Sequence, residues 1–291
     1  RTLLLEAKFC DECGHDLTQP GQIPHVDYSR PQSYIPKFLA NKILTTRNSM
    51  EGERKLVTAF FADVVNYTSI SEKLDPEEIH QIMNGCFKLM MDEIHRYEGT
   101  VNQFTGDGIM ALFGAPLAHE DHAQRTCYAA LSTQKAMEKF GERIWREYGV
   151  EFKIRVGINS GLVIVGSIGD DLHMDYTALG DTINLASRLQ KMGKPGSILV
   201  SKDTYKMARD FFNFKPLGKV TVKGKEEPLE AYELIGAGEV ETRLGAAILR
   251  GLTKFVGRDR ELGSLKKAFE KIQVGLGQVI GLVGEAGVGK S

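Results

Sequence analysis

The chain has 291 residues, and its 37 Lys and Arg nearly balance 38 Asp and Glu, for a formal net charge of −1 at pH 7. This balance excludes the basic field with which a domain attracts nucleic acid, so no nucleic-acid partner is expected. No apolar run reaches the roughly 18 residues of a membrane span, and the amino terminus lacks the pattern of a signal peptide. We therefore expect a cytoplasmic protein with no membrane partner and one main domain.

The first 17 residues contain a possible metal knuckle. Cys10 and Cys13 lie in FCDECGHDL with the spacing of a zinc ribbon. A structural Zn²⁺ takes four ligands and the chain has no second CxxC, so residues 1–17 are interpreted as a partial ribbon whose first half would precede Arg1. A redox role is disfavoured because no βαβ pattern surrounds the pair.

The polar residues 18–52 predict a linker that ends in a short helix between Tyr34 and Thr46. The other two cysteines, Cys86 and Cys127, lie within helical patterns and are predicted to be small core residues.

Two aspartates follow β-like segments between residues 55 and 114. Asp63 ends the run LVTAFFAD, and Asp107 lies in the turn of VNQFTGDGIMALFG; a helix of i, i+3, i+4 apolar spacing starts between them at Pro76. If the hairpin pairs beside the first strand, the two carboxylates converge, and oxygen ligands without His or Cys suit Mg²⁺ or Mn²⁺. Taken alone, each aspartate is more often a structural turn or cap residue than a catalytic one.

Further elements follow in order. Residues 120–148 predict an amphipathic helix in which Trp145 packs, and FKIRVGINSG and LVIVGSIG predict two consecutive strands. DYTALGDTINLASRLQ predicts a strand and then a helix with Asn184 and Arg188 on one face. Such a pair suits the orientation of a ribose and the stabilisation of phosphate charge, although it is also ordinary on a solvent-facing helix. LGKVTVKGKEEPLEAYELI predicts a hairpin with Lys223 in its turn.

Three motifs together, FFADVVNYTSI, FTGDGIMALFG and DYTALGDTINLASRL, resemble the catalytic domain of class III nucleotidyl cyclases, in particular the soluble adenylyl cyclase-like branch. The resemblance covers residues 53–235. It implies an α+β fold, a ferredoxin-like βαββαβ unit with extra C-terminal strands. It also implies an adenylate cyclase of a signalling protein, in which the ribose 3′-hydroxyl of ATP attacks the α-phosphate to give 3′,5′-cyclic AMP and pyrophosphate.

The resemblance also implies roles for individual residues. Asp63, Asp107 and the backbone carbonyl of Val64 would hold two Mg²⁺ or Mn²⁺ ions per site, and Asn184 and Arg188 would be catalytic. The substrate-binding positions would be Tyr67, Thr68, Arg155 and Lys223 for the phosphates, and Gln103 and Thr177 for the base. Because family members build the site between two subunits, a homodimer with shared active sites is implied.

The base-reading residues depart from the family pattern. Adenylyl cyclases usually have Lys at the position of Gln103, and guanylyl cyclases have Glu. Glutamine can pair with either base, whereas Thr177 resembles the bicarbonate-responsive branch; ATP is therefore the expected substrate and bicarbonate a candidate regulator. Two alternatives stay open: a cyclase with relaxed ATP/GTP choice, and a weak or inactive cyclase fold that binds nucleotide and dimerises as a sensor for an attached ATPase module.

The last residues suggest another domain. Residues 236–254 predict a linker, and from residue 255 a helical stretch and an apolar strand, QVIGLV, precede GEAGVGKS. This GxxxxGK[ST] phosphate loop resembles the start of a STAND or AAA-type ATPase. Because the chain ends before the helix that would grip the phosphates, we expect a truncated P-loop domain over residues 255–291, without ATPase activity. Its loop residues are Gly284, Gly289, Lys290 and Ser291.

Overall fold

The computed structural model of the chain describes residues 34–46, 54–168, 174–177, 182–221, 228–240 and 257–281. They belong to two compact units, one within residues 1–241 and one within residues 242–291, and each is described by itself. Three sets of predicted residues lie outside the described ranges: the knuckle cysteines Cys10 and Cys13, the hairpin-turn residue Lys223, and the P-loop residues Gly284, Gly289, Lys290 and Ser291.

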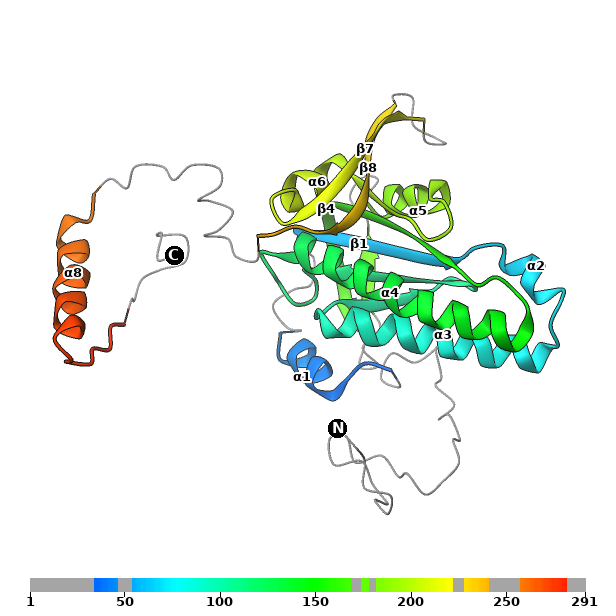
Figure 1. Ribbon diagram of the computed structural model, residues 1–291, viewed down its shortest axis with the longest axis horizontal. Helices are drawn as coiled ribbons and strands as arrows, with labels where there is room; N and C mark the ends of the chain where they lie inside the picture. Colours follow the sequence, from blue (N-terminus) through cyan, green and yellow to red (C-terminus); the bar gives the residue numbers. More distant parts are fainter. Residues whose placement is uncertain are drawn as a thin grey trace, which may run out of the picture. The chain divides into compact units, whose positions relative to one another are not determined.

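The first unit has the predicted α+β order (Figure 1). Its elements are α1 (Lys37–Thr46), β1 (Arg54–Val64), α2 (Tyr67–Ser71), α3 (Pro76–Arg96), β2 (Thr100–Phe104), β3 (Gly108–Phe113), α4 (His122–Tyr148), β4 (Ile154–Ile168), β5 (Met174–Thr177), α5 (Thr182–Met192), β6 (Ile198–Ser201), α6 (Lys202–Ala208), β7 (Phe212–Val220) and β8 (Leu229–Ala237). The path β1-α3-β2-β3-α4-β4 is the expected βαββαβ unit, and β5 to β8 are the extra strands. This part of the fold prediction is confirmed.

One sheet of eight strands runs through the unit. Seven of them follow the order β2-β3-β1-β4-β6-β8-β7, and β5 pairs with β4. The pair β4–β6 is parallel, whereas β1 pairs antiparallel with β3 on one side and with β4 on the other. Because β1 is central, the last residues of β1 have neighbours on both sides, and this arrangement positions the candidate site.

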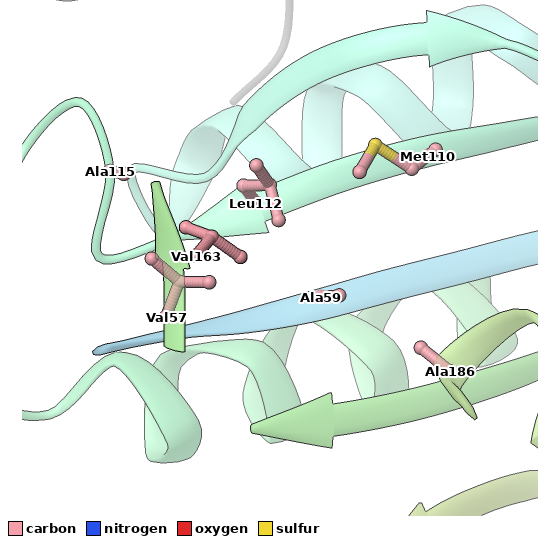
Figure 2. Close-up of a cluster of buried hydrophobic side chains, with 7 residues drawn as sticks. All are labelled: Val57, Ala59, Met110, Leu112, Ala115, Val163 and Ala186. Carbon is pink, nitrogen blue, oxygen red and sulfur yellow. The ribbon is translucent and has the colours of Figure 1, made fainter. Parts of the chain in front are cut away.

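The two faces of the sheet carry different helices. On one face α4 contacts β1, because His122 Nδ1 lies 2.6 Å from Thr58 Oγ1 in a buried hydrogen bond. On the other face α5 contributes Ala186 to a buried cluster with Val57 and Ala59 of β1 (Figure 2). The full cluster is Val57, Ala59, Met110, Leu112, Ala115, Val163 and Ala186. Side chains alternate along a strand, so Asp63 shares the α5 face with Val57 and Ala59.

A glycine allows α5 to approach the sheet closely. A Cβ at Gly157 of β4 would lie 2.2 Å from both Ala186 O and Gln190 N of α5. Real Cβ atoms do not approach backbone atoms so closely, so any larger residue at this position would have to displace the helix. The distance between α5 and the sheet therefore depends on Gly157.

The local signals for the long helices are accurate. α3 begins at Pro76, as predicted, and Glu78 accepts a hydrogen bond of 3.2 Å from the backbone N–H of Asp75, which satisfies one of the amide donors at the helix start. Cys86 and Cys127 are fully buried, which confirms their prediction as core residues. Among the described residues, no helix combines the length and the apolarity that a bilayer crossing requires.

Two interpretations of the sequence are wrong in the first unit. The two segments predicted as consecutive strands are joined in the single strand β4 (Ile154–Ile168), because β1 pairs with it in continuous register across Ser160 and Gly161. At Gly161 an added Cβ would lie 2.5 Å from Thr182 Oγ1, so this glycine serves the approach of α5 and not a turn. Trp145 does not pack: it is 61% exposed near the end of α4.

In the second unit, the predicted helix is present as α8 (Asp259–Gln273). Two of its large apolar residues are exposed, Phe269 at 61% and Ile272 at 48%. The part of QVIGLV that is described, residues 278–281, has no strand geometry, contrary to the sequence prediction. A β-strand needs a neighbouring strand to satisfy its backbone groups, and none of the described strands pairs with residues 278–281.

Candidate active site

The two aspartates singled out from the sequence lie at one corner of the sheet. Asp63 is the second-last residue of β1, and Asp107 lies in the hairpin between β2 and β3. The hairpin pairs beside β1: Asp63 is opposite Gly108, and Val64 N donates to Asp107 O at 3.1 Å. A Cβ at Gly108 would lie 2.4 Å from Ala62 O, so this close pairing requires glycine after the aspartate.

Asp107 is in an environment that disfavours its charge. Burial raises the pKa of its carboxyl above the ordinary value, and the negative charge of Asp63 raises it further. A backbone hydrogen bond and the positive charges of Arg155 and Lys191 act in the opposite direction and do not cancel the shift. A cation bound between the two carboxylates would remove this repulsion.

Arg155 holds the other carboxylate of the pair. It lies opposite Asp63 on β4, and its Nε and Nη2 donate to the two carboxylate oxygens of Asp63 at 2.8 and 3.1 Å. The hydrogen bond to Asp63 raises the pKa of the Arg155 guanidinium. Nη1 of Arg155 donates to the carbonyl of Lys191 in the last turn of α5 at 3.0 Å. Sequence patterns give no signal for this contact of Lys191, which depends on the packing of α5.

The donor set fits a hard divalent cation. Within the described part of the chain, no three His, Cys, Asp or Glu side chains come together as a possible metal site. The corner instead offers two carboxylates and the backbone of Val64, which matches the preference of Mg²⁺ for one or two carboxylates completed by water and substrate phosphates. The negative charge of Asp63 adds to burial in raising the pKa of Asp107, and a bound cation would offset this repulsion.

Helix α5 presents Asn184 and Arg188 on its outer side. Asn184 is exposed and Arg188 half-buried, whereas Ala186 and Leu189 are buried. The start of the helix is fixed to β4, because Thr182 Oγ1 donates to Leu162 O at 3.0 Å and Asn159 Nδ2 donates to Thr182 O at 2.8 Å. The amide and the guanidinium thus belong to a helix held on the same sheet face as Asp63.

Gln103 is exposed next to a bulge of β2. The register shifts between Val101 and Gln103, so that Gln103 lies opposite Met110 and Asn102 is the additional residue. Met110 belongs to the cluster on the α5 face, so Gln103 shares that face, while Val101 and Phe104 face α3. The bulge was not predicted. The sequence did contain a signal for the bulge, because the apolar residues Val101 and Phe104 are three apart and could not share a face in a regular strand.

The other candidate positions are only partly described. Tyr67 and Thr68 open α2, directly after β1, and are half-buried and exposed, respectively. Thr177 ends β5 and lies opposite Ile164 of β4 in the backbone register; its side chain is outside the description. The structure thus brings Asp63, Asp107 and Arg155 together and places Gln103 and α5 on the same face. Lys223 lies outside the described residues.

The domain that carries this sheet and this pair of carboxylates is similar to known proteins. Residues 50–236 match the profile described as the adenylate and guanylate cyclase catalytic domain, and the chain belongs to this family. Adenylate cyclase 1 of Rhizobium meliloti is 36% identical over 207 residues, which are 70% of this chain and 31% of that protein. The chain therefore spans about a third of the length of this relative.

Similar proteins include both kinds of cyclase. Guanylate cyclase soluble subunit beta-2 of Rattus norvegicus is 29% identical over 192 residues, covering 66% of this chain and 28% of that protein. The crystal structure of the adenylyl cyclase CyaB from P. aeruginosa matches with a TM-score of 0.59 at 33% identity, over 64% of this chain and 97% of that one. The guanylate cyclase domain of RhGC from Catenaria anguillulae in complex with GTP matches with a TM-score of 0.57 at 30% identity, over 64% and 100%.

Proposed function

We propose that the chain is an adenylate cyclase that converts ATP to 3′,5′-cyclic AMP and pyrophosphate. The observation that supports this proposal most directly is the position of Asp107 beside Asp63 at the end of β1, where Gly108 is opposite Asp63 and the charge of Asp63 acts on Asp107. The 36% identity to an adenylate cyclase of Rhizobium meliloti adds to it.

In the proposed reaction, the 3′-oxygen of the ribose bonds to the α-phosphorus. The bond from that phosphorus to the bridging oxygen breaks, pyrophosphate leaves with the electron pair, and the 3′-hydroxyl loses its proton. Asp63, Asp107 and the Val64 carbonyl would hold Mg²⁺ or Mn²⁺, two ions per site. When bound, these ions lower the pKa of the attacking hydroxyl and neutralise the leaving pyrophosphate.

Side chains of the protein would bind and orient the substrate and stabilise the charge that develops on it. The Arg188 fork would stabilise the charge that develops on the phosphate oxygens, and Asn184 would orient the ribose. Arg155 would bind phosphate, together with Tyr67, Thr68 and Lys223. The proposal places the Asn184 and Arg188 of one copy opposite the carboxylates of a second copy, so the active species is a homodimer that shares its sites.

A cyclase with relaxed choice between ATP and GTP is the second candidate, and Gln103 is the observation that favours it. The Gln103 side chain is exposed on the α5 face, and its amide can present either a donor or an acceptor to a base. Relatives named as adenylate and as guanylate cyclases have similar identities, so overall similarity does not separate the candidates.

The test is product formation by the purified chain with ATP or GTP in separate reactions, with Mn²⁺ or Mg²⁺, and cyclic nucleotides resolved by chromatography. We expect cyclic AMP in excess over cyclic GMP. Gln103→Lys should raise the preference for ATP, and Gln103→Glu should shift it toward GTP. Addition of bicarbonate to the same reactions tests its proposed regulatory role. No product from either nucleotide, with a protein shown to be dimeric, would contradict the proposal and favour a nucleotide sensor.

A further inference from the structure

The strongest ionic contact at the candidate site joins two groups that the proposed reaction uses separately. Both oxygens of the Asp63 carboxylate accept hydrogen bonds from Arg155, at 2.8 and 3.1 Å. The two side chains are only 16% and 26% exposed. A two-bond guanidinium–carboxylate contact that is partly shielded from water is stronger and better oriented than an ordinary surface ion pair.

The same guanidinium is also bound to α5. Its third nitrogen, Nη1, donates to Lys191 O at 3.0 Å, so each of its three nitrogens has a protein acceptor. Arg155 therefore connects the carboxylate at the end of β1 with the last turn of the helix that carries Asn184 and Arg188.

This arrangement competes with cation binding. A divalent ion at Asp63 needs the carboxylate oxygens that Arg155 now occupies, and two positive groups on the same oxygens repel each other. A triphosphate offers the guanidinium an alternative set of acceptors, since the planar fork matches phosphate as well as carboxylate. Phosphate binding and cation binding at Asp63 are therefore favoured by the same movement of Arg155.

We infer that Arg155 is a latch on Asp63: without nucleotide it holds the carboxylate and the end of α5, and the phosphates of the nucleotide draw it away, so that Asp63 accepts its cation only when nucleotide arrives. This inference rests on the proposed function. By linkage, the cation and the phosphates must then strengthen each other's binding by the same factor.

The experiment measures Mn²⁺ binding to the full chain without nucleotide, from the free-Mn²⁺ signal in electron paramagnetic resonance. Wild type should bind Mn²⁺ weakly, and Arg155→Met should bind it roughly tenfold more tightly because a charge-assisted two-bond competitor is gone. Arg155→Lys keeps the charge but loses the fork, so it should also bind more tightly than wild type. In cyclase assays, Arg155→Met should instead be less active, since it lacks a phosphate contact.

Lys191→Met is the matched control. It removes a positive charge that acts on Asp107, as Arg155 does, but leaves the backbone carbonyl that Arg155 contacts. We expect Mn²⁺ affinity to change by less than about threefold, the scale of a screened charge. Equal tightening in Lys191→Met and Arg155→Met would mean general electrostatics and would overturn the latch.

The latch and the proposed metal site fail in different ways. If wild type and Arg155→Met bind Mn²⁺ equally and Asp63→Asn abolishes binding, the latch is wrong and the metal site stands. If Asp63→Asn leaves Mn²⁺ binding intact, the metal site of the proposed function is wrong. Circular dichroism of each variant checks folding, and if Arg155→Met does not fold, Arg155→Lys alone decides.

Discussion

Two carboxylate clusters of the catalytic domain differ in their charge balance. Glu98, in the turn after α3, lies within ion-pair distance of Lys42 of α1, His119 and Arg125. The hydrogen bond from Lys42 is the largest of the effects that together lower the pKa of Glu98. Asp107 has the opposite shift, because burial and the neighbouring Asp63 raise its pKa.

The opposite pKa shifts of Glu98 and Asp107 distinguish a structural ion cluster around Glu98 from a candidate binding site at Asp107. Glu98 is surrounded by more positive than negative groups and ties α1 to the domain, next to the buried apolar contacts of Leu39 and Ile43. At the corner of β1, the guanidinium of Arg155 is hydrogen-bonded to Asp63 and acts on Asp107 only through its charge. A carboxylate that the protein leaves incompletely neutralised is the one that can bind a cation.

The largest expected effect is on catalysis. Asp107→Asn should lower cyclase activity by on the order of 100- to 1000-fold, as loss of a preorganised charged group at a reacting phosphate does. Stability should not fall, because the substitution removes the repulsion with Asp63. Activity assays with Mn²⁺ and thermal unfolding of the same samples check both results; activity within tenfold of wild type would refute a metal role for Asp107.

The second largest expected effect is a dependence of stability on pH, caused by His95, which lies close to Glu98 in the chain. His95, whose carbonyl accepts from Glu98 N, is buried, and burial lowers its pKa from 6.5 to about 4. The unfolded chain binds the proton on His95 more readily than the folded chain. The free energy of unfolding is therefore at its full value above pH 6.5 and decreases as the pH falls toward 4. The total decrease in the free energy of unfolding from this group is about 3 kcal/mol.

Urea unfolding of wild type and His95→Gln at pH 7.5 and pH 4.5 tests this effect. The free energy of unfolding of wild type should fall more between the two pH values than that of His95→Gln, because carboxylate effects are common to both. Parallel curves would show that His95 does not carry the difference.

The spacing of α5 at the metal corner gives the third prediction. Gly157→Ala places a Cβ against Ala186 O and Gln190 N, so α5 must shift. Overpacking of this kind costs about 1–3 kcal/mol of stability, and activity should fall with the displacement of Asn184 and Arg188. Gly236→Ala is the control, since nothing lies within 4 Å of a Cβ there. Equal unfolding midpoints for the two variants would contradict the close approach.

The smallest effect is expected for Glu98→Gln. Loss of partly exposed ion pairs should lower the free energy of unfolding by about 1 kcal/mol, and cyclase activity should stay within about twofold of wild type, on the scale of a small change in barrier. Denaturant titration and the cyclase assay measure the two quantities. A loss of activity comparable to that of Asp107→Asn would show that both clusters serve the reaction, and the contrast between them would be wrong.

Local sequence patterns were sufficient for most of the architecture. The apolar spacing and the proline of α3, the amphipathic pattern of α4 and the hairpin that contains Asp107 are properties of short segments, and the structure has each of them. Sequence patterns gave the wrong local structure where contacts with another strand or helix determine it. Gly161 resembles a turn in the sequence but lies within β4, because β1 pairs with β4 across it. Thr182 of α5 occupies the space that a side chain at this position would take.

For the candidate site, the sequence by itself determined which residue types are available and in what order: an aspartate at the end of a strand, an aspartate in a hairpin turn, then an amide and a guanidinium on one helix. Only the tertiary structure decided that Arg155 binds Asp63 and the end of α5, and that a bulge directs Gln103 to the α5 face. It also decided that the pKa of Glu98 is lowered whereas that of Asp107 is raised. The physical reason is range. Periodicity and capping act within a few residues, whereas burial and charge pairing depend on strands and helices that are distant in the chain and adjacent in the fold.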